Sequence, residues 1–273
     1  MFKIQPMMNI LCPTDFSPNS EIAINYAIEL SNKAKAKLHI ITSFVLPSSA
    51  GSFRSLDRHV HDYLNDDLKE FINKVESNIT SGIPPEYDAL EGAPSTVISS
   101  YARHHDIDLI IMGTKGSSSI KNLVIGSTTQ KVINQTLVPV LAIPTGTEWH
   151  DKSKGQMLLC LDSHGIGNMK SIKFLTELKD ILHKNVNVLH VSTQNDQIEL
   201  SPDTGKLSGI VDNVFDVTGD DVVLEIKNFA KEKATDMIVM IARKHNFWQS
   251  IFQESYTEGE LFASTLPLLV LPE

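Results

Sequence analysis

The sequence predicts an α/β protein made of two tandem domains, each a doubly wound parallel sheet. Short, continuous apolar runs alternate with segments whose apolar residues recur at helical spacing, as expected for parallel sheets with helices on both faces. The pattern occurs twice, in the same order, along the chain. With 273 residues, the chain is long enough for two domains of ordinary size.

Matching segments in the two halves define the repeat. They pair "MNILCPTDFS" with "QMLLCLDSHG", "AKLHIITSF" with "VNVLHVSTQ", "YARHHDIDLIIMGTKG" with "FAKEKATDMIVMIARKH", and "TLVPVLAIP" with "TLPLLVLP". The polar segment Thr145–Gly155 separates the copies and is typical of a linker. We therefore predict domains at residues 1–146 and 155–273.

The first half begins with a short apolar strand that includes Ile10–Pro13. The helix "SEIAINYAIELSNKA" follows, with Ser20 as its expected N-cap and apolar residues at helical spacing. The β-rich run "AKLHIITSFV" predicts a strand, and "LDRHVHDYLNDDLKEFINKVESNI" predicts a long amphipathic helix. After a short strand at "YDALEG", proline and hydroxyl residues open the helix "PSTVISSYARHHD".

The run "DLIIMG" predicts a strand buried on both faces, followed by the helix "GSTTQKVINQT" and a last strand, "VPVLAIP". The second half repeats this order but differs between its second and third strands. The segment "STQNDQIELSPDTGKLSGIVDN" is polar and rich in turn residues, so at most a short helix is expected there. The second domain therefore looks eroded.

Composition restricts the classes of partner. The formal net charge is -9, which argues against a broad surface for nucleic acid or for an anionic membrane. The two cysteines, Cys12 and Cys160, lie in apolar runs and are expected to be buried rather than disulfide-bonded. No secretory signal and no membrane span are recognised, so a cytoplasmic protein is expected.

Three glycines mark the connection between a predicted strand and a predicted helix. They are Gly113, Gly116 and Gly126, and Ser127 and Thr128 follow the last of them. In open parallel sheets, ligands bind beyond the carboxyl ends of the strands. Glycine permits positive φ and close backbone approach, and free N–H groups at a helix start attract phosphate. The residues suit a phosphate cradle, although a flexible loop with a serine N-cap fits the glycines alone equally well.

The glycine spacing is G-x2-G-x9-G-S, and it resembles the nucleotide loop of the universal stress protein family in its ATP-binding branch. "PTDFS" at Pro13–Ser17, "DLIIMGTKG" and "VPVLAIP" also resemble that family at the expected places. The resemblance covers nearly the whole chain as the tandem two-domain type, and it is specific in the first domain. It implies adenine nucleotide alpha-hydrolase-like, Rossmann-like domains packed as an internal pseudo-dimer through their last strands.

The resemblance also implies a set of ligand-binding residues. Asp15 would contact the ribose or adenine side of ATP, and the backbone near Ser43 would meet adenine, although the family usually has an aliphatic residue there. The whole set is Pro13, Asp15, Ser43, Met112, Gly113, Lys115, Gly116, Gly126, Ser127 and Thr128. ADP and AMP are alternative ligands, and Mg²⁺ would accompany the nucleotide. From the residues alone, Asp15 could equally belong to a turn before a capped helix, and Lys115 could be solvated.

The second copy of the loop lacks this chemistry. Matching the two halves by sequence puts Ala242 in the place of Gly113 and His245 in the place of Gly116. Asp162 corresponds to Asp15, but bulky aromatic residues and an acidic residue replace the later part of the loop. They are Phe247, Trp248, Phe252 and Glu254. One nucleotide site per chain is therefore expected.

No other motif indicates a catalytic or metal site. The chain has ten histidines, but adjacent and alternate pairs such as His104 and His105 point in different directions on a helix, and no cysteine or carboxylate completes a set at ligand spacing. The leading hypothesis is a stress-response sensor or regulator that binds nucleotide and contacts unidentified protein partners, with further dimerisation open. The alternatives are a slow ATP hydrolase, for which no base or arginine finger is evident, and a scaffold without nucleotide.

Overall fold

The computed structural model describes residues 8–45, 54–114, 126–149, 155–162, 164–192, 205–243 and 266–273. The first half contains β1 (Asn9–Thr14), α1 (Pro18–Ala34), β2 (Lys37–Phe44), α2 (Arg54–Val75), the 3₁₀ turn η2 (Glu76–Asn78), β3 (Glu86–Glu91), α3 (Pro94–His104), β4 (Leu109–Gly113), α4 (Ser127–Gln135) and β5 (Val140–Ile143). The second contains β6 (Gln156–Cys160), α5 (Met169–Leu182), β7 (Asn185–Ser192), the 3₁₀ turn η3 (Gly205–Leu207), β8 (Asn213–Thr218), α6 (Val222–Glu232), β9 (Met237–Ala242) and β10 (Leu268–Pro272).

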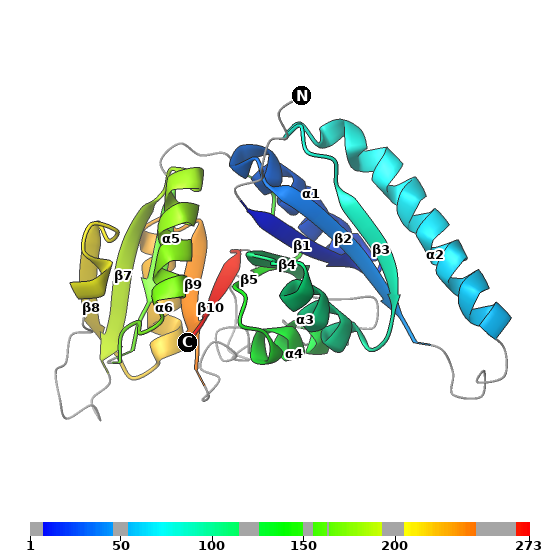
Figure 1. Ribbon diagram of the computed structural model, residues 1–273. Helices are drawn as coiled ribbons and strands as arrows, with labels where there is room; N and C mark the ends of the chain where they lie inside the picture. Colours follow the sequence, from blue (N-terminus) through cyan, green and yellow to red (C-terminus); the bar gives the residue numbers. More distant parts are fainter. Residues whose placement is uncertain are drawn as a thin grey trace.

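The strands form one ten-stranded sheet with the order β3-β2-β1-β4-β5-β10-β9-β6-β7-β8. All neighbouring strands within each half run parallel, as the apolar runs predicted, and β5 and β10 pair antiparallel at the centre (Figure 1). The order of strands is the same in the two halves when each is counted from its outer edge. The predicted fold class, two tandem doubly wound domains packed as a pseudo-dimer, is confirmed.

The two halves are related by a local two-fold axis, which can be located from the pairing of β5 with β10. Asp108 accepts a hydrogen bond from the Asn9 N–H at 2.8 Å, and Asp236 accepts one from the Gln156 N–H at 2.7 Å, so these positions are equivalent in the two halves. Counting the same number of residues forward from Asp108 and from Asp236 makes Leu141 equivalent to Leu269. These two leucines pair directly between β5 and β10. The pseudo-symmetry axis therefore passes through this pair, as in an isologous dimer interface.

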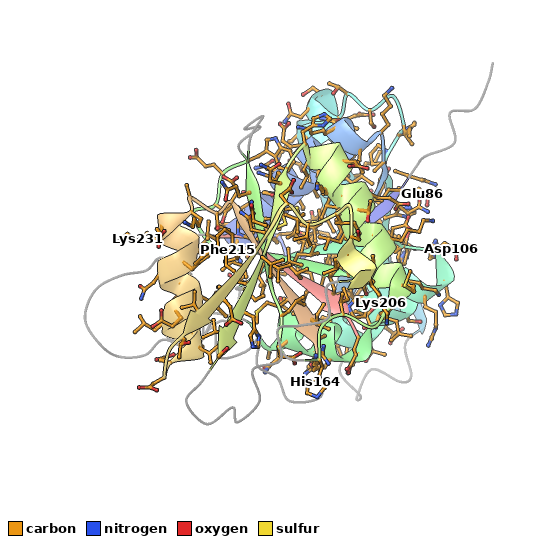
Figure 2. All side chains as sticks on the ribbon, turned by 90° about the vertical axis from the view of Figure 1, so that its left-hand side faces the viewer. Glu86, Asp106, His164, Lys206, Phe215 and Lys231 are labelled. Carbon is orange, nitrogen blue, oxygen red and sulfur yellow. The ribbon has the colours of Figure 1, made fainter. Side chains whose placement is uncertain are left out.

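Each face of the sheet carries one apolar core that runs through both halves. In β4, Leu109 and Ile111 point into the core beneath α1, α2 and α5, whereas Ile110 and Met112 point into the core beneath α3, α4 and α6. Side chains fill the space between the sheet and the helices on both faces (Figure 2). Strands covered on both faces need apolar residues at every position, which explains the continuous apolar runs.

The start of α1 differs from the predicted one. Ser17, not Ser20, is the N-cap: its side chain accepts a hydrogen bond from the Ser20 N–H, and Pro18 occupies the start of the helix. Proline suits this position because its fixed φ matches the helix and the N–H it lacks would have no intrahelical partner. Ser20 lies in the first turn, where its hydroxyl donates to the Ser17 carbonyl at 2.9 Å.

Between β7 and β8, the described residues contain only the three-residue turn η3, which agrees with the prediction of at most a short helix there.

Both cysteines are buried and free, and burial raises the pKa of the Cys160 thiol to about 12. In the predicted linker, Trp149 packs edge-on against Tyr26 of α1, with ring centroids 4.7 Å apart. Among the described residues, no helix combines the length and apolar character needed to cross a bilayer.

Ending the chain after Thr147 should expose β5 as a free sheet edge. The four residues of β5 are fully buried and pair with β10, so the shortened chain would leave apolar side chains and backbone groups without partners. We expect it to dimerise through β5 in the antiparallel register or to precipitate, as sedimentation and solubility measurements would show. A soluble monomer as stable as the full-length chain would contradict the inferred role of this pairing.

Candidate functional site

The predicted ligand residues meet at the edge of the sheet formed by the carboxyl ends of β1, β2 and β4. Asp15 follows β1, Ser43 is the penultimate residue of β2, and Gly113 ends β4. Helix α4 begins at the same edge, because the Gly126 N–H donates to the carbonyl of Thr114, the residue after β4. The structure thus brings together residues far apart in sequence, while Lys115 and Gly116 lie outside the described residues.

The exposure of these residues separates side chains that could touch a ligand from those that could not. Asp15 and Ser127 are exposed, and Pro13, Ser43 and Thr128 are half-buried. Met112 is only 5% exposed and packs in the core beneath α3 and α4, so only its backbone could meet a ligand.

The turn between β1 and α1 is held by its own side chains. Thr14 Oγ1 accepts a hydrogen bond from the Phe16 N–H at 3.0 Å, and Asp15 Oδ1 accepts one from the Ser17 N–H at 3.1 Å. Phe16 has a φ of 58°, in the left-handed region. Asp15 therefore has the turn-forming role that its neighbours suggested, and it remains exposed just beyond the carboxyl end of β1.

Gly113 is required by packing. A Cβ at this position would lie 2.4 Å from Asn19 Nδ2 and 2.9 Å from the Asn19 carbonyl oxygen of α1. The Asn19 side chain is positioned in turn by Thr145, whose hydroxyl donates to Asn19 Oδ1 at 3.1 Å. Gly113 does not have positive φ, so of the two reasons expected for a glycine here, the close approach of a neighbour applies.

Helix α4 begins without a side-chain cap. Its N-cap residue is Gly126, with φ −64° and ψ 149°, and this residue makes no side-chain cap hydrogen bond. The Thr129 hydroxyl, one turn inside, donates to the Gly113 carbonyl at 2.9 Å and fixes the helix against β4. The first N–H groups of a helix have no intrahelical acceptors and carry partial positive charge. The start of α4 is therefore suited to an anion.

The second half shows a different arrangement at the corresponding edge. The equivalence of Asp108 and Asp236 puts Ile241, not Ala242, at the position of Gly113, so the sequence matching was wrong by one residue. Arg243 then takes the position of Lys115. Its Nε contacts Asp162 Oδ2 at 3.0 Å, its Nη1 contacts Glu273 Oε1 at 3.2 Å, and its guanidinium also donates to the Gly165 carbonyl.

Arg243 thereby supplies the positive charge next to Asp162, the counterpart of Asp15. An arginine fork between two carboxylates and a carbonyl satisfies all three acceptors within the chain. The carboxylate of the second domain is neutralised by the protein itself at the position where the first domain presents an exposed carboxylate.

The structure also adds residues to the first site that the sequence did not single out. Asn19, Thr129 and Thr145 tie α1, α4 and the end of β5 to Gly113. Their signal in the sequence was weak, because each is a single polar residue among many. Their partners lie up to 126 positions away along the chain.

Replacing Gly113 with alanine should destabilise the protein even without a ligand. The new methyl group would have to displace the Asn19 backbone, so we expect a loss of about 1–3 kcal/mol in the free energy of unfolding. Gly167→Ala is the matched control, because a Cβ there meets nothing within 4 Å, and its effect should stay within about 0.5 kcal/mol. Equal denaturation midpoints for the two variants would contradict the packing role.

Replacing Arg243 with leucine should destabilise the second domain. Asp162 and Glu273 would then lose the arginine between them, and we expect a loss of about 1–2 kcal/mol in the free energy of unfolding measured with urea. Lys173→Leu serves as the control, since Lys173 is highly exposed and its ion pair with Glu177 spans 3.6 Å. If both variants lose the same small amount, the arginine contacts contribute no more than an ordinary surface pair.

Comparison with known proteins gives concordant matches for this chain. A model of the universal stress protein family matches residues 7–144. The chain is 29% identical over 140 residues to universal stress protein MJ0531 and 30% identical over 152 residues to universal stress protein MJ0577, both of Methanocaldococcus jannaschii. Each alignment spans 49% of this chain, and the two span 80% and 93% of the respective relatives.

Among solved structures, a universal stress protein from Archaeoglobus fulgidus is similar over both halves. The likeness covers 97% of this chain and 98% of that protein, with a TM-score of 0.64 and 19% sequence identity. At this identity, the comparison concerns the fold, and it includes the tandem arrangement of the two halves.

Proposed function

The chain belongs to the universal stress protein family, and from this premise we propose that its first half, residues 1–146, binds ATP or a related adenine nucleotide. The observation that carries the proposal is the start of α4. There, a helix of nine residues with a glycine N-cap begins at the same sheet edge as the exposed carboxylate of Asp15. A negatively charged phosphate complements the free N–H groups of the helix, and hydroxyl groups of a ribose complement the carboxylate.

The proposed contacts divide by chemistry. Asp15 accepts hydrogen bonds from the ribose or adenine side, and the backbone near Pro13, Ser43 and Met112 borders adenine. The phosphates are held by the remaining residues of the set, which are Gly113, Lys115, Gly116, Gly126, Ser127 and Thr128. ADP and AMP use the same contacts with fewer phosphates, and Mg²⁺ accompanies ATP as a counterion on its oxygens.

The second half, residues 155–273, is proposed to support this site rather than to bind a nucleotide of its own. Its counterpart of Asp15 is already paired with Arg243, and its counterpart of Gly113 is Ile241. Its sheet covers the β5 edge and continues both cores. A preorganised site loses less entropy when the ligand binds. The protein would then act as a stress-response sensor or regulator whose nucleotide state is read by partners.

Calorimetric titration of the full-length chain with ATP and Mg²⁺ should give a stoichiometry near one. Gly126→Val should lower the affinity about a hundredfold or more, equivalent to about 2.8 kcal/mol, because its side chain would occupy the approach to the α4 N–H groups. The φ and ψ of Gly126 are open to valine, so the loss of stability should be about 1 kcal/mol or less. Gly167→Val, in the second half, should bind as the unaltered chain does.

The outcomes separate the proposed function from its alternatives. Two equal sites per chain, or unchanged affinity in Gly126→Val, would refute the assignment. Nucleotide extracted from the purified protein adds a second criterion. Retained ATP supports a sensor, retained ADP together with measurable turnover supports a slow hydrolase, and absence of both nucleotide and binding supports a scaffold.

A further inference from the structure

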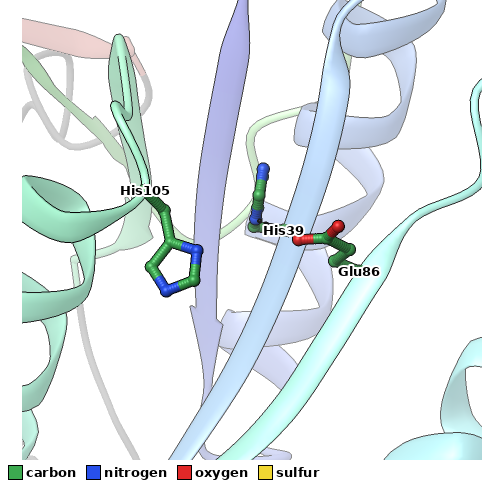
Figure 3. Close-up of side chains that lie close together, drawn as sticks. All are labelled: His39, Glu86 and His105. Carbon is green, nitrogen blue, oxygen red and sulfur yellow. Dashed lines mark ion pairs between the residues drawn. The ribbon is translucent and has the colours of Figure 1, made fainter.

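Three potential metal ligands come together at the opposite edge of the first domain, near the amino ends of its outer strands. They are His39 of β2, Glu86 of β3 and His105, which directly follows α3 (Figure 3). His39 and Glu86 are direct partners in the register of the two parallel strands, so their side chains share a face of the sheet. Ligand atoms of the three residues all lie within 4.8 Å of one another.

The separation of His39 and Glu86 matches that of two ligands around a tetrahedral ion. His39 Nδ1 lies 3.4 Å from Glu86 Oε2 and 3.1 Å from the Tyr101 hydroxyl oxygen. A tetrahedral Zn²⁺ ion with ligand bonds of about 2.0–2.1 Å has ligand atoms about 3.3–3.4 Å apart. His39 and Glu86 are therefore already at the spacing that a shared ion requires, with small movements needed from the exposed His105.

Burying the polar side chain of His39 in the core costs stability. It is 3% exposed, and within the part of the chain that the structure describes its Nε2 has no hydrogen-bond partner. A buried polar atom without a partner costs about 1–3 kcal/mol, a loss that an apolar side chain at this position would avoid. The atom that lies near Glu86 is Nδ1, so an ion bound there leaves Nε2 unchanged, and the contribution of the buried ring to the site is a fixed position for Nδ1.

Neighbouring side chains hold the three residues in place. The Tyr101 ring stacks on the His105 ring, with centroids 3.8 Å apart and an angle of 8°. The Tyr101 hydroxyl bonds to His39 Nδ1, and an ion bound at this atom would have to displace it. Lys37 bonds to Glu86 Oε1, which leaves Oε2 directed at His39. Such supporting contacts orient ligands in known metal sites.

The charged groups beside the site have opposite effects on a cation. Glu86 supplies the carboxylate whose Oε2 lies 3.4 Å from His39 Nδ1. Lys37 is the opposing charge, since its ammonium group repels an ion at Oε2.

We propose that His39, Glu86 and His105 bind a divalent first-row transition metal ion, with Zn²⁺ as the best match. Two imidazoles and one carboxylate suit Zn²⁺, whereas Mg²⁺ prefers oxygen ligands alone. Because His105 and Glu86 are exposed, water can reach the remaining coordination position. The ion would join β3, the outermost strand of the first half, to β2 and α3. The site is separate from the proposed nucleotide site, which lies at the carboxyl ends of the strands.

The test uses the full-length chain without a histidine tag, stripped of metal by a chelator, and titrated calorimetrically with Zn²⁺ at pH 7.5 without nucleotide. We expect one ion per chain, a rise in the thermal unfolding midpoint on binding, and visible absorption bands of four-coordinate Co²⁺ when cobalt replaces zinc. His105→Ala and Glu86→Gln should each weaken Zn²⁺ binding at least about tenfold. Both residues are exposed, so both variants should fold.

His104→Ala is the matched control. His104 is adjacent and exposed, but its ring bonds to the Ser100 carbonyl of its own helix at 2.7 Å, so its loss should leave Zn²⁺ affinity unchanged. Absence of Zn²⁺ binding by the unaltered chain would overturn the proposal. So would equal affinity in the unaltered chain and His105→Ala, because the ion would then be bound by other histidines. None of these results depends on whether the nucleotide proposal holds.

Discussion

The antiparallel pairing of β5 with β10 is the interaction on which the rest of the architecture depends. A parallel α/β domain that ends in a short strand leaves that strand as an open edge, with unpaired backbone groups and apolar side chains. Here each last strand covers the other, and the Leu141–Leu269 pair lies on the local symmetry axis. The two sheets become one, and the apolar core on each face continues from one half into the other.

The direction of this pairing also separates the chemistry of the two halves. Because β5 and β10 run in opposite directions, the carboxyl ends of the strands in the first half point away from those in the second. The proposed nucleotide site and the Asp162–Arg243–Glu273 contacts therefore lie at opposite edges of the common sheet. One edge has a helix start without a side-chain cap and the exposed Asp15, and the other has the contacts of Arg243 with Asp162 and Glu273. The repeated fold thus retains the packing in both halves, while the residues at the two edges differ.

Glycines in the first half illustrate how packing and ligand binding share a position. Gly113 lies at the edge where a ligand would sit, but the contact that forbids a side chain there is with Asn19 of α1. Gly126 has backbone angles open to other residues, so its missing side chain is not required by the fold in the same way. The two glycines look alike in the sequence and differ in physical role. Near the amino end of β2, the buried His39 is the opposite case, because it is a polar side chain whose Nε2 has no hydrogen-bond partner among the described residues.

The sequence by itself determined the order of strands and helices, the duplication and the edge of the sheet where a ligand would bind. These follow from local periodicity and from glycine spacing, which depend on neighbouring residues. Only the tertiary structure decided that Ile241 is the counterpart of Gly113 in the second half, that Arg243 contacts Asp162, and that residues as distant as His39, Glu86 and His105 meet. Such contacts depend on strand register and on how α3 lies against β2, and a shift of one residue would turn each side chain to the other face. The local sequence pattern does not encode the strand register or the position of α3, because both are set by the packing of the whole sheet.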